Sequence, residues 1–456
     1  MKDIYLVNYS VKGIKSLDQL VSLSFYKKTF TSNGNNFQDY NIKGIYGING
    51  SGKTAIVTSV KVFKNLILNR DYLNNPYIQS QLDELMNKKL QQMDFVVDFF
   101  VDFENKPKLY RYEISLCRER GGRIVIDREK LSFRIATSRK EEMQQLFEVS
   151  DGIIVDVVLS NQAFKDYLID MTKNLLKNSS ISSFTIDYIK GLKDGKELLN
   201  ESVINGLVVL CLFGHSLLVY LERTDDHSDY YIDDVIKGLD ENEDKEIRDN
   251  LWRAVRDAKR LSANEILPGR STISKKYYSQ YEKSVSKLFD FISIFKRDLK
   301  GIVIDKQNNR ENYVCDLIMD YGSYKINTEF ESTGIKKLIK LYTSFNAMAL
   351  GDIVFIDELD SNLHDVYLCA LLEYLMEHGK GQLCFTTHNI GPMDILKRNK
   401  KSIDFLSVNH RIYSWTKNGN YSPANLYKGG MIEGSPFNID SIDFLRAFDV
   451  EEGDEE

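Results

Sequence analysis

Eight residues near the start of the chain constrain its fold more than any other feature. They read Gly47-Ile48-Asn49-Gly50-Ser51-Gly52-Lys53-Thr54 and follow the apolar segment Ile42 to Tyr46. The pattern G-x-x-x-x-G-K-[ST] between a strand and a helix predicts a phosphate-binding loop. Its glycines let backbone N–H groups turn toward phosphates, and the following helix points its N-terminus at the same anion. The sequence therefore predicts an α/β protein that binds and hydrolyses a nucleoside triphosphate.

The residue types in this loop predict separate roles. Lys53 can reach the β- and γ-phosphates, and the Thr54 hydroxyl can ligate magnesium. We expect the bound nucleotide to contact Gly47, Asn49, Gly50, Ser51, Gly52, Lys53 and Thr54.

A second motif lies far downstream, where an apolar strand ends in two adjacent carboxylates. Residues 352–358 read Asp-Ile-Val-Phe-Ile-Asp-Glu, the Walker B pattern. Asp357 at the end of the strand is expected to hold magnesium together with Thr54. The neighbouring Glu358 is placed to polarise the water that attacks the γ-phosphate. The alternative, an ordinary strand and an acidic turn, is less favoured because further motifs follow.

Two of those motifs come after Walker B. Asp360 lies in the segment Leu359-Asp360-Ser361-Asn362-Leu363-His364. A further strand, Gln382 to Phe385, leads into Thr386-Thr387-His388-Asn389. A histidine at the end of that strand can contact the γ-phosphate, so His388 is a candidate catalytic residue beside Glu358.

Taken together, these residues resemble ATPases of the ABC type, and within them the head domains of SMC, RecF and OLD-like proteins. The Asn49-Gly50 pair is typical of that class, Asp360 falls on its D-loop, and His388 falls on its switch histidine. The resemblance covers the head, roughly two-thirds of the chain. It implies an ABC-type ATPase head with a mixed sheet and an antiparallel arm sheet, using ATP and Mg²⁺.

The signature motif of that family corresponds to residues 331–336, Glu-Ser-Thr-Gly-Ile-Lys. This segment keeps the Ser-x-Gly kernel, but Glu331, Thr333 and Ile335 replace the usual leucine, middle glycine and glutamine. In the family the signature of one subunit covers the nucleotide of another. The resemblance therefore implies that Ser332, Gly334 and Asp360 act in trans. The alternative for Ser332 is a simple helix cap.

The order of strand-like and helical segments predicts three regions. Residues 1–164 form the first half of the head, with strands at 4–9 and 20–26 and an arm sheet from about residue 95 to residue 135. Residues 165–300 form a helical insert, with helices expected over 246–261 and 275–299. Residues 301–456 form the second half of the head. The apolar run Val203 to Leu221 predicts a buried helix or helical hairpin in the insert rather than a membrane span. Gln162, after the strand Ile153 to Leu159, is a candidate magnesium ligand, or only a loop residue.

Composition and the N-terminal sequence bear on the cellular compartment of the protein and on its attraction to DNA. Five cysteines without C-x-x-C spacing indicate reduced thiols in a cytoplasmic protein rather than a disulfide or zinc framework. The N-terminus lacks the pattern of a cleavable signal. A net charge of −6 gives no overall attraction to DNA, so a DNA contact would need a local basic face.

Two functions remain open. OLD nucleases carry a Toprim domain after such a head, and too few residues follow His388 to encode one. The resemblance therefore favours an ATPase subunit of an anti-phage system such as PARIS or Septu. It implies homo-oligomers built on head-to-head dimers, with a hexamer as one option, and a separate nuclease effector encoded nearby that answers a phage-derived trigger. The alternative is a RecF-like or SMC-like clamp that binds DNA. A catalytically dead, nucleotide-gated scaffold is disfavoured because Lys53, Asp357 and Glu358 are all present.

Overall fold

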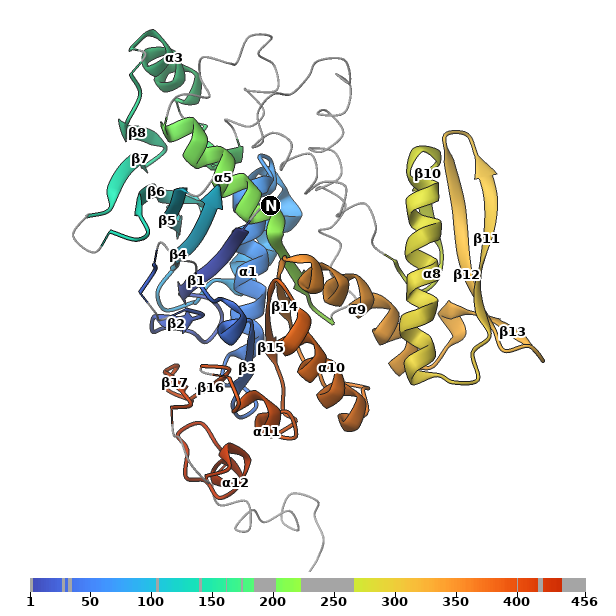
Figure 1. The fold of residues 1–456 in the computed structure, drawn as a ribbon. Helices are drawn as coiled ribbons and strands as arrows, with labels where there is room; N and C mark the ends of the chain where they lie inside the picture. The colour runs from blue at the N-terminus through green and yellow to red at the C-terminus, as the bar shows by residue number, and fades with distance from the viewer. Residues whose placement is uncertain are drawn as a thin grey trace, which may run out of the picture.

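The computed structural model describes residues 3–26, 29–31, 35–103, 106–138, 142–160, 162–173, 175–183, 202–222, 266–399, 401–416 and 421–436. These residues form a mixed α/β fold with a six-stranded, a seven-stranded and a four-stranded sheet (Figure 1). The predicted helix over 246–261 lies outside the described residues. The predicted α/β class is confirmed.

The six-stranded sheet, here called the head sheet, carries the predicted nucleotide motifs. Its order is β17-β16-β3-β15-β14-β9, and every pairing is parallel except that between β16 and β17. The inner strands are short apolar runs buried on both faces, as expected of a parallel sheet covered by helices. The strands span Ile42–Tyr46 (β3), Leu217–Tyr220 (β9), Ile353–Ile356 (β14), Gln382–Thr386 (β15), Ile403–Leu406 (β16) and Ile412–Ser414 (β17).

The seven-stranded sheet is antiparallel and is here called the arm sheet. Its order is β2-β1-β4-β5-β6-β7-β8, so the predicted arm sheet and N-terminal strand pair are confirmed. Buried Phe95 and Phe99 alternate with partly exposed residues along β4, as the period-2 pattern predicts. The strands span Asp3–Lys12 (β1), Val21–Ser24 (β2), Gln92–Phe103 (β4), Lys106–Arg118 (β5), Ile124–Ile135 (β6), Gln144–Ser150 (β7) and Ile153–Val157 (β8).

A shared core joins the two sheets. Helix α1 (Lys53–Leu68) lies between them, and its Phe63 stacks edge-on against Tyr9 of the arm sheet. The buried side-chain amide of Gln382 also pairs with both backbone groups of Leu6, at 2.7 and 2.9 Å. This amide acts like one more strand residue at the place where the register of β1 shifts. The arm sheet and the head sheet are therefore expected to unfold together.

The apolar run Val203 to Leu221 takes a different place from the predicted one. It forms helix α5 (Ser202–Ser216) and then β9, which pairs in parallel with the Walker B strand β14. Phe213 of α5 stacks on Phe99 of the arm sheet, with ring centroids 4.3 Å apart. The run is buried because it completes the head, and not because it forms the core of an insert. No helix in the described ranges is both long and apolar enough to cross a bilayer.

The four-stranded sheet and helix α8 form a separate unit, here called the hairpin unit (residues 266–330). Its antiparallel strands are β10 (Ser271–Ser274), β11 (Gly301–Asn309), β12 (Asn312–Asp320) and β13 (Lys325–Asn327). Helix α8 (Tyr278–Phe295) agrees with the helix predicted over 275–299 and packs on one face of this sheet. The unit joins the head through helix α9 (Thr333–Leu350). Further α-helices in the described part of the chain are α2 (Pro76–Leu85), α3 (Gln162–Thr172), α10 (Asp365–His378), α11 (Met393–Leu396) and α12 (Pro423–Lys428).

Candidate nucleotide site

Three motif segments meet at one edge of the head sheet. The phosphate loop follows β3, Asp357-Glu358 follow β14, and Thr386-Thr387-His388 end and follow β15, which lies between the other two strands. Because the three strands are parallel, their carboxyl ends lie at the same edge. The sheet therefore gathers residues that are more than 300 positions apart in the sequence.

The loop before α1 has the backbone geometry of a phosphate cradle. Gly50 and Gly52 have φ angles of 80° and 103°, in the left-handed region that only glycine adopts without cost. A Cβ atom on Gly47 would lie 2.5 Å from the carbonyl oxygen of Leu406, so a larger residue does not fit there. Successive turns of this kind direct backbone N–H groups toward one point, which is where an anion binds.

The polar side chains of the loop also fit a phosphate group. The Ser51 hydroxyl is buried and has no hydrogen-bond partner among the described residues. The Lys53 ammonium donates to the carbonyls of Gly47 and Ile48 at 2.8 and 3.0 Å, which holds it over the loop. Burial lowers the pKa of Lys53 to about 8, although the carboxylates of Asp357, Glu358 and Asp360 oppose that shift. Phosphate oxygens would supply an acceptor for the Ser51 hydroxyl and a negative charge beside the Lys53 ammonium.

This pKa predicts how nucleotide affinity depends on pH. A bound phosphate favours protonated Lys53, so above the free-state pKa, binding must take up a proton. We expect the affinity for MgATP to fall as pH rises from about 7 to about 9.5, and a Lys53→Arg variant, which stays charged, to show a flatter profile. Binding of a fluorescent ATP analogue at a series of pH values measures this. Equal slopes for the two proteins would contradict the role of Lys53.

Thr386 organises the two Walker B carboxylates. Its hydroxyl donates to Asp357 Oδ1 at 2.7 Å and accepts from the Glu358 backbone N–H at 2.8 Å. Asp357 is therefore buried and fixed in direction, whereas the side chain of Glu358 is exposed to solvent. Glu358 also has a φ of 49°, which is uncommon for a residue with a side chain and turns the chain sharply at this point. The two acids are thus held differently, as expected for a metal ligand and a residue that faces water.

His388 and Asp360 lie near the same charges. Burial and the Lys53 ammonium lower the pKa of His388, while Asp360, Glu358 and Asp357 oppose this. The lowered pKa favours the neutral imidazole of His388, which can accept or donate a hydrogen bond. Asp360 acts on both Lys53 and His388 within the same chain. Its role across an interface stays a prediction.

The signature segment begins helix α9. The Ser332 hydroxyl accepts from the Ile335 N–H at 3.4 Å, so this serine does cap the helix. Ser332 and Thr333 are nevertheless exposed, which leaves the helix N-terminus open to an approaching surface. A Cβ on Gly334 would lie 2.8 Å from the carbonyl oxygen of Asn362, so the first turn of α9 packs tightly against the segment after Walker B.

Gln162 is not brought to this site. It is an exposed residue at the start of α3, and its side chain donates to Asp166 at 2.8 Å. Helix α3 follows β8, the last strand of the arm sheet, at the far edge from β1 and β2 (Figure 1). Gln162 is also not the loop residue of the alternative, because it is the first residue of a helix. Of the predicted magnesium ligands, Thr54 lies in the first turn of α1 and Asp357 directly follows β14, both at the motif edge of the head sheet.

Magnesium would depend on the nucleotide here. Among the described residues, no three His, Cys, Asp or Glu side chains gather to hold a metal ion. A hydroxyl and one carboxylate are too few for octahedral Mg²⁺, which usually takes its remaining ligands from phosphates and water. Thr54 and Asp357 fit that arrangement.

Three further polar residues lie at this edge, and no sequence pattern predicts them. Lys337 on α9 is buried and contacts the turn after β14, where Ser361 and Glu222 complete a small polar cluster. Lys337 lies among apolar residues in the sequence of a helix. A lysine in such a helix is normally predicted to be exposed, because lysine is rarely buried unless it is paired. Glu222 follows β9, which lies within the run Val203 to Leu221 that the sequence predicted to be helical.

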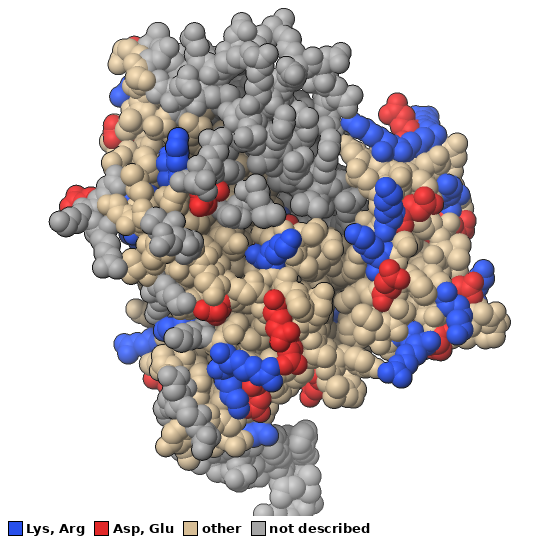
Figure 2. All heavy atoms as spheres, in the orientation of Figure 1, with Lys and Arg blue, Asp and Glu red and all other residues tan. Residues whose placement is uncertain are grey.

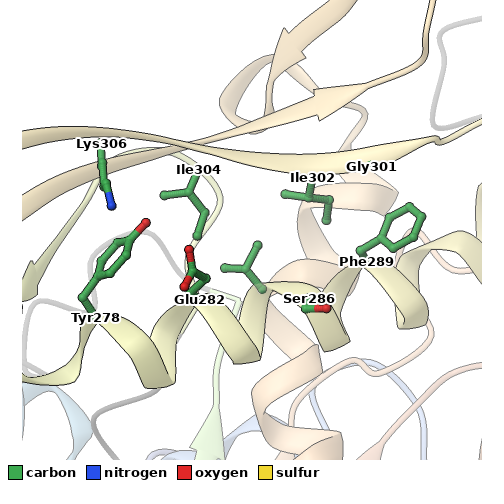
Figure 3. Close-up of a pocket in the computed structure, with 9 residues that line it drawn as sticks. Tyr278, Glu282, Ser286, Phe289, Gly301, Ile302, Ile304 and Lys306 are labelled. Atoms are coloured by element: carbon green, nitrogen blue, oxygen red, sulfur yellow. The ribbon is translucent and has the colours of Figure 1, made fainter.

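A second hollow lies in the hairpin unit, away from these motifs. Figure 3 shows side chains of α8 and β11 pointing toward one another across a groove of about 480 Å³. Its lining includes the apolar residues Val285, Ile302 and Ile304. Glu282 and Lys306 lie toward one end (Figure 3). It contains none of the predicted site residues.

Comparisons with known proteins show what this chain is similar to. A family model described as "AAA domain, putative AbiEii toxin, Type IV TA system" matches residues 212–394. The matched region begins inside α5 and includes Ser332, Asp357 and His388, but not the phosphate loop. The chain is also similar to a solved structure titled "Structure of the recombination mediator protein RecF-ATPrS in RecFOR pathway", with 12% identity and a TM-score of 0.36 over 91% of this chain and 99% of that one. No curated protein sequence matches the chain.

Proposed function

We propose that the chain is an ATP-driven regulatory subunit of a bacterial anti-phage system that controls a separate nuclease effector. The observation that carries the ATPase part is the meeting of Lys53, Asp357, Glu358 and His388 at one edge of the head sheet. A phosphate anchor, a metal ligand, a water-facing carboxylate and a neutral histidine are the groups that γ-phosphate hydrolysis requires. The protein supplies them as positioned charges and needs no covalent intermediate.

The exposed signature suggests how ATP would control assembly. Ser332 and the N-terminus of α9 are open to a partner surface, and helix N-termini bind anions. When two heads meet, each signature would add donors to the γ-phosphate held by the other head. ATP would then favour head-to-head dimers, and hydrolysis would release them.

The defence role rests on the sequence resemblance and on the matched family model, whose description names a toxin of a toxin–antitoxin system. In this role the chain would hold the effector until a phage-derived trigger changes the state of the heads. The effector would be encoded beside it. The proposed assembly is a homo-oligomer of head-to-head dimers.

A DNA clamp is the second candidate, and one observation favours it. Exposed lysines are frequent on the hairpin unit, at positions 275, 276, 283, 287, 300 and 306. Figure 2 shows the basic side chains on this part of the surface interspersed with acidic ones, so this face does not form one continuous basic patch. A clamp would show ATP hydrolysis stimulated by DNA and DNA binding that weakens steeply with salt.

The proposal predicts that protection against phage requires both the chain and its neighbouring gene. Cells would carry either gene alone, both genes, or both with Lys53→Ala, and plaque formation would be counted. We expect protection only from the intact pair. Protection by this chain alone, or protection that survives Lys53→Ala, would overturn the proposal. DNA-stimulated turnover of the purified chain without phage protection would support the clamp.

A further inference from the structure

Lys337 is a buried cation whose surroundings connect two parts of the proposed site. Its side chain is only 2% exposed, and the ammonium donates to the carbonyl oxygen of Glu358 at 2.6 Å. It also contacts the Ser361 hydroxyl and lies 3.6 Å from Glu222 Oε2. The Ser361 hydroxyl in turn donates to Glu222 at 2.7 Å. The four residues come from three segments: Lys337 from α9, Glu358 and Ser361 from the turn after β14, and Glu222 from just after β9.

This cluster holds the backbone carbonyl of Glu358, the residue whose carboxylate faces water. Glu358 has a left-handed backbone, which costs free energy unless its surroundings hold it. Thr386 holds its N–H, and Lys337 holds its carbonyl together with the Ser361 N–H, which donates at 3.1 Å. Both peptide groups that flank the Glu358 side chain are therefore tethered, and the tethers determine where its carboxylate points.

The contact between Lys337 and the Glu358 carbonyl also links the turn after β14 to the signature segment at the start of α9. Ser332 caps α9, and Lys337 lies five residues further on, about 7.5 Å along the helix axis. Burial of the ammonium lowers the pKa of Lys337, while Glu222, Asp360 and Glu358 oppose this. A buried ammonium is costly unless it is paired, so the helix and the catalytic turn are held in one relative position. A shift of the signature helix would move a donor away from the Glu358 carbonyl.

We propose that Lys337 is a positioning residue that links the signature helix to the orientation of Glu358, so that turnover depends on where α9 lies. This inference rests on the proposed ATPase function and adds a regulatory contact within one chain. Lys337 touches neither nucleotide nor water in this role. It acts only through the peptide group of Glu358.

The test compares Lys337→Met with Lys340→Met, in which an exposed lysine on the same helix is changed. Lys340 lies outside the signature segment, residues 331–336. We expect Lys337→Met to lower the turnover rate about tenfold or more while MgATP affinity stays within about threefold. The Lys340→Met protein should keep both values. Steady-state turnover, analogue binding and thermal melting would be measured for each protein.

A third variant separates positioning from simple instability. Lys337→Met leaves Glu222 without its cation, and adding Glu222→Gln removes that unpaired charge. We expect the double variant to regain melting temperature but not turnover. Full turnover in Lys337→Met, or turnover that returns with stability in the double variant, would overturn the inference while leaving the ATPase function intact. A native protein without any turnover would overturn both.

Discussion

Replacement of Lys53 by alanine is expected to lower MgATP affinity about 100-fold, because hydrogen bonds from a charged donor to phosphate contribute about 1.5–3 kcal/mol each. Hydrolysis at ordinary ATP concentrations should then be lost. The fold should persist, since the substitution removes a buried ammonium whose pKa is already lowered by its surroundings. Equilibrium binding of a fluorescent ATP analogue and thermal melting would be measured together.

Lys89→Ala is a suitable control for this substitution. Lys89 is 84% exposed and lies 3.9 Å from Asp18, so its removal should change neither affinity nor stability measurably. Unchanged affinity in Lys53→Ala would mean that the loop does not bind the nucleotide through this lysine.

Glu358→Gln is expected to retain MgATP binding and to lose turnover by about 100-fold or more, which is the range that a general base contributes. Glutamine has the same shape, and the backbone tethers from Thr386 and Lys337 remain. The ATP-bound state should therefore accumulate. Light scattering with ATP should show the mass of a dimer for this variant.

The same measurement tests the composite site. Adding Ser332→Arg to Glu358→Gln places a large cation at the exposed N-terminus of α9, and the double variant should stay monomeric with ATP. A Glu358→Gln protein with native turnover would remove Glu358 from its proposed role. A double variant that still dimerises would remove Ser332 from the interface.

The nucleotide motifs could be found from the sequence because each is short and local. A phosphate loop places its glycines, lysine and threonine within eight residues, and Walker B marks its strand by an apolar run that ends in acids. Their meeting at one edge follows from the parallel pairing of β3, β15 and β14. The strand order itself is not written in any local pattern.

The remaining parts depend on contacts between distant segments. Gly214, His215 and Ser216 interrupt the apolar run just before the four residues of β9, and such a short interruption is compatible with a longer helix or a helical hairpin. Gln162 was assigned by its place after a strand, and that strand belongs to the arm sheet. Lys337 was missed because only the folded chain supplies the carbonyl and carboxylate that make its burial acceptable.

Helix α9 packs into two hydrophobic cores, one in the hairpin unit and one in the head, and so couples them mechanically. Its first half packs with the hairpin unit through Ile335, Leu338, Ile339 and Tyr342. Its second half packs with the head sheet and α10 through Leu341, Phe345, Ala347 and Met348. A continuous helix of 18 residues, about 27 Å long, thus works as a lever whose fulcrum lies in the head. If the hairpin unit turned the first half of α9 by about 10° about residue 341, Ser332 at its tip would move by about 2 Å. In the proposed dimer, a shift of that size would break a hydrogen bond between Ser332 and the nucleotide of the other head.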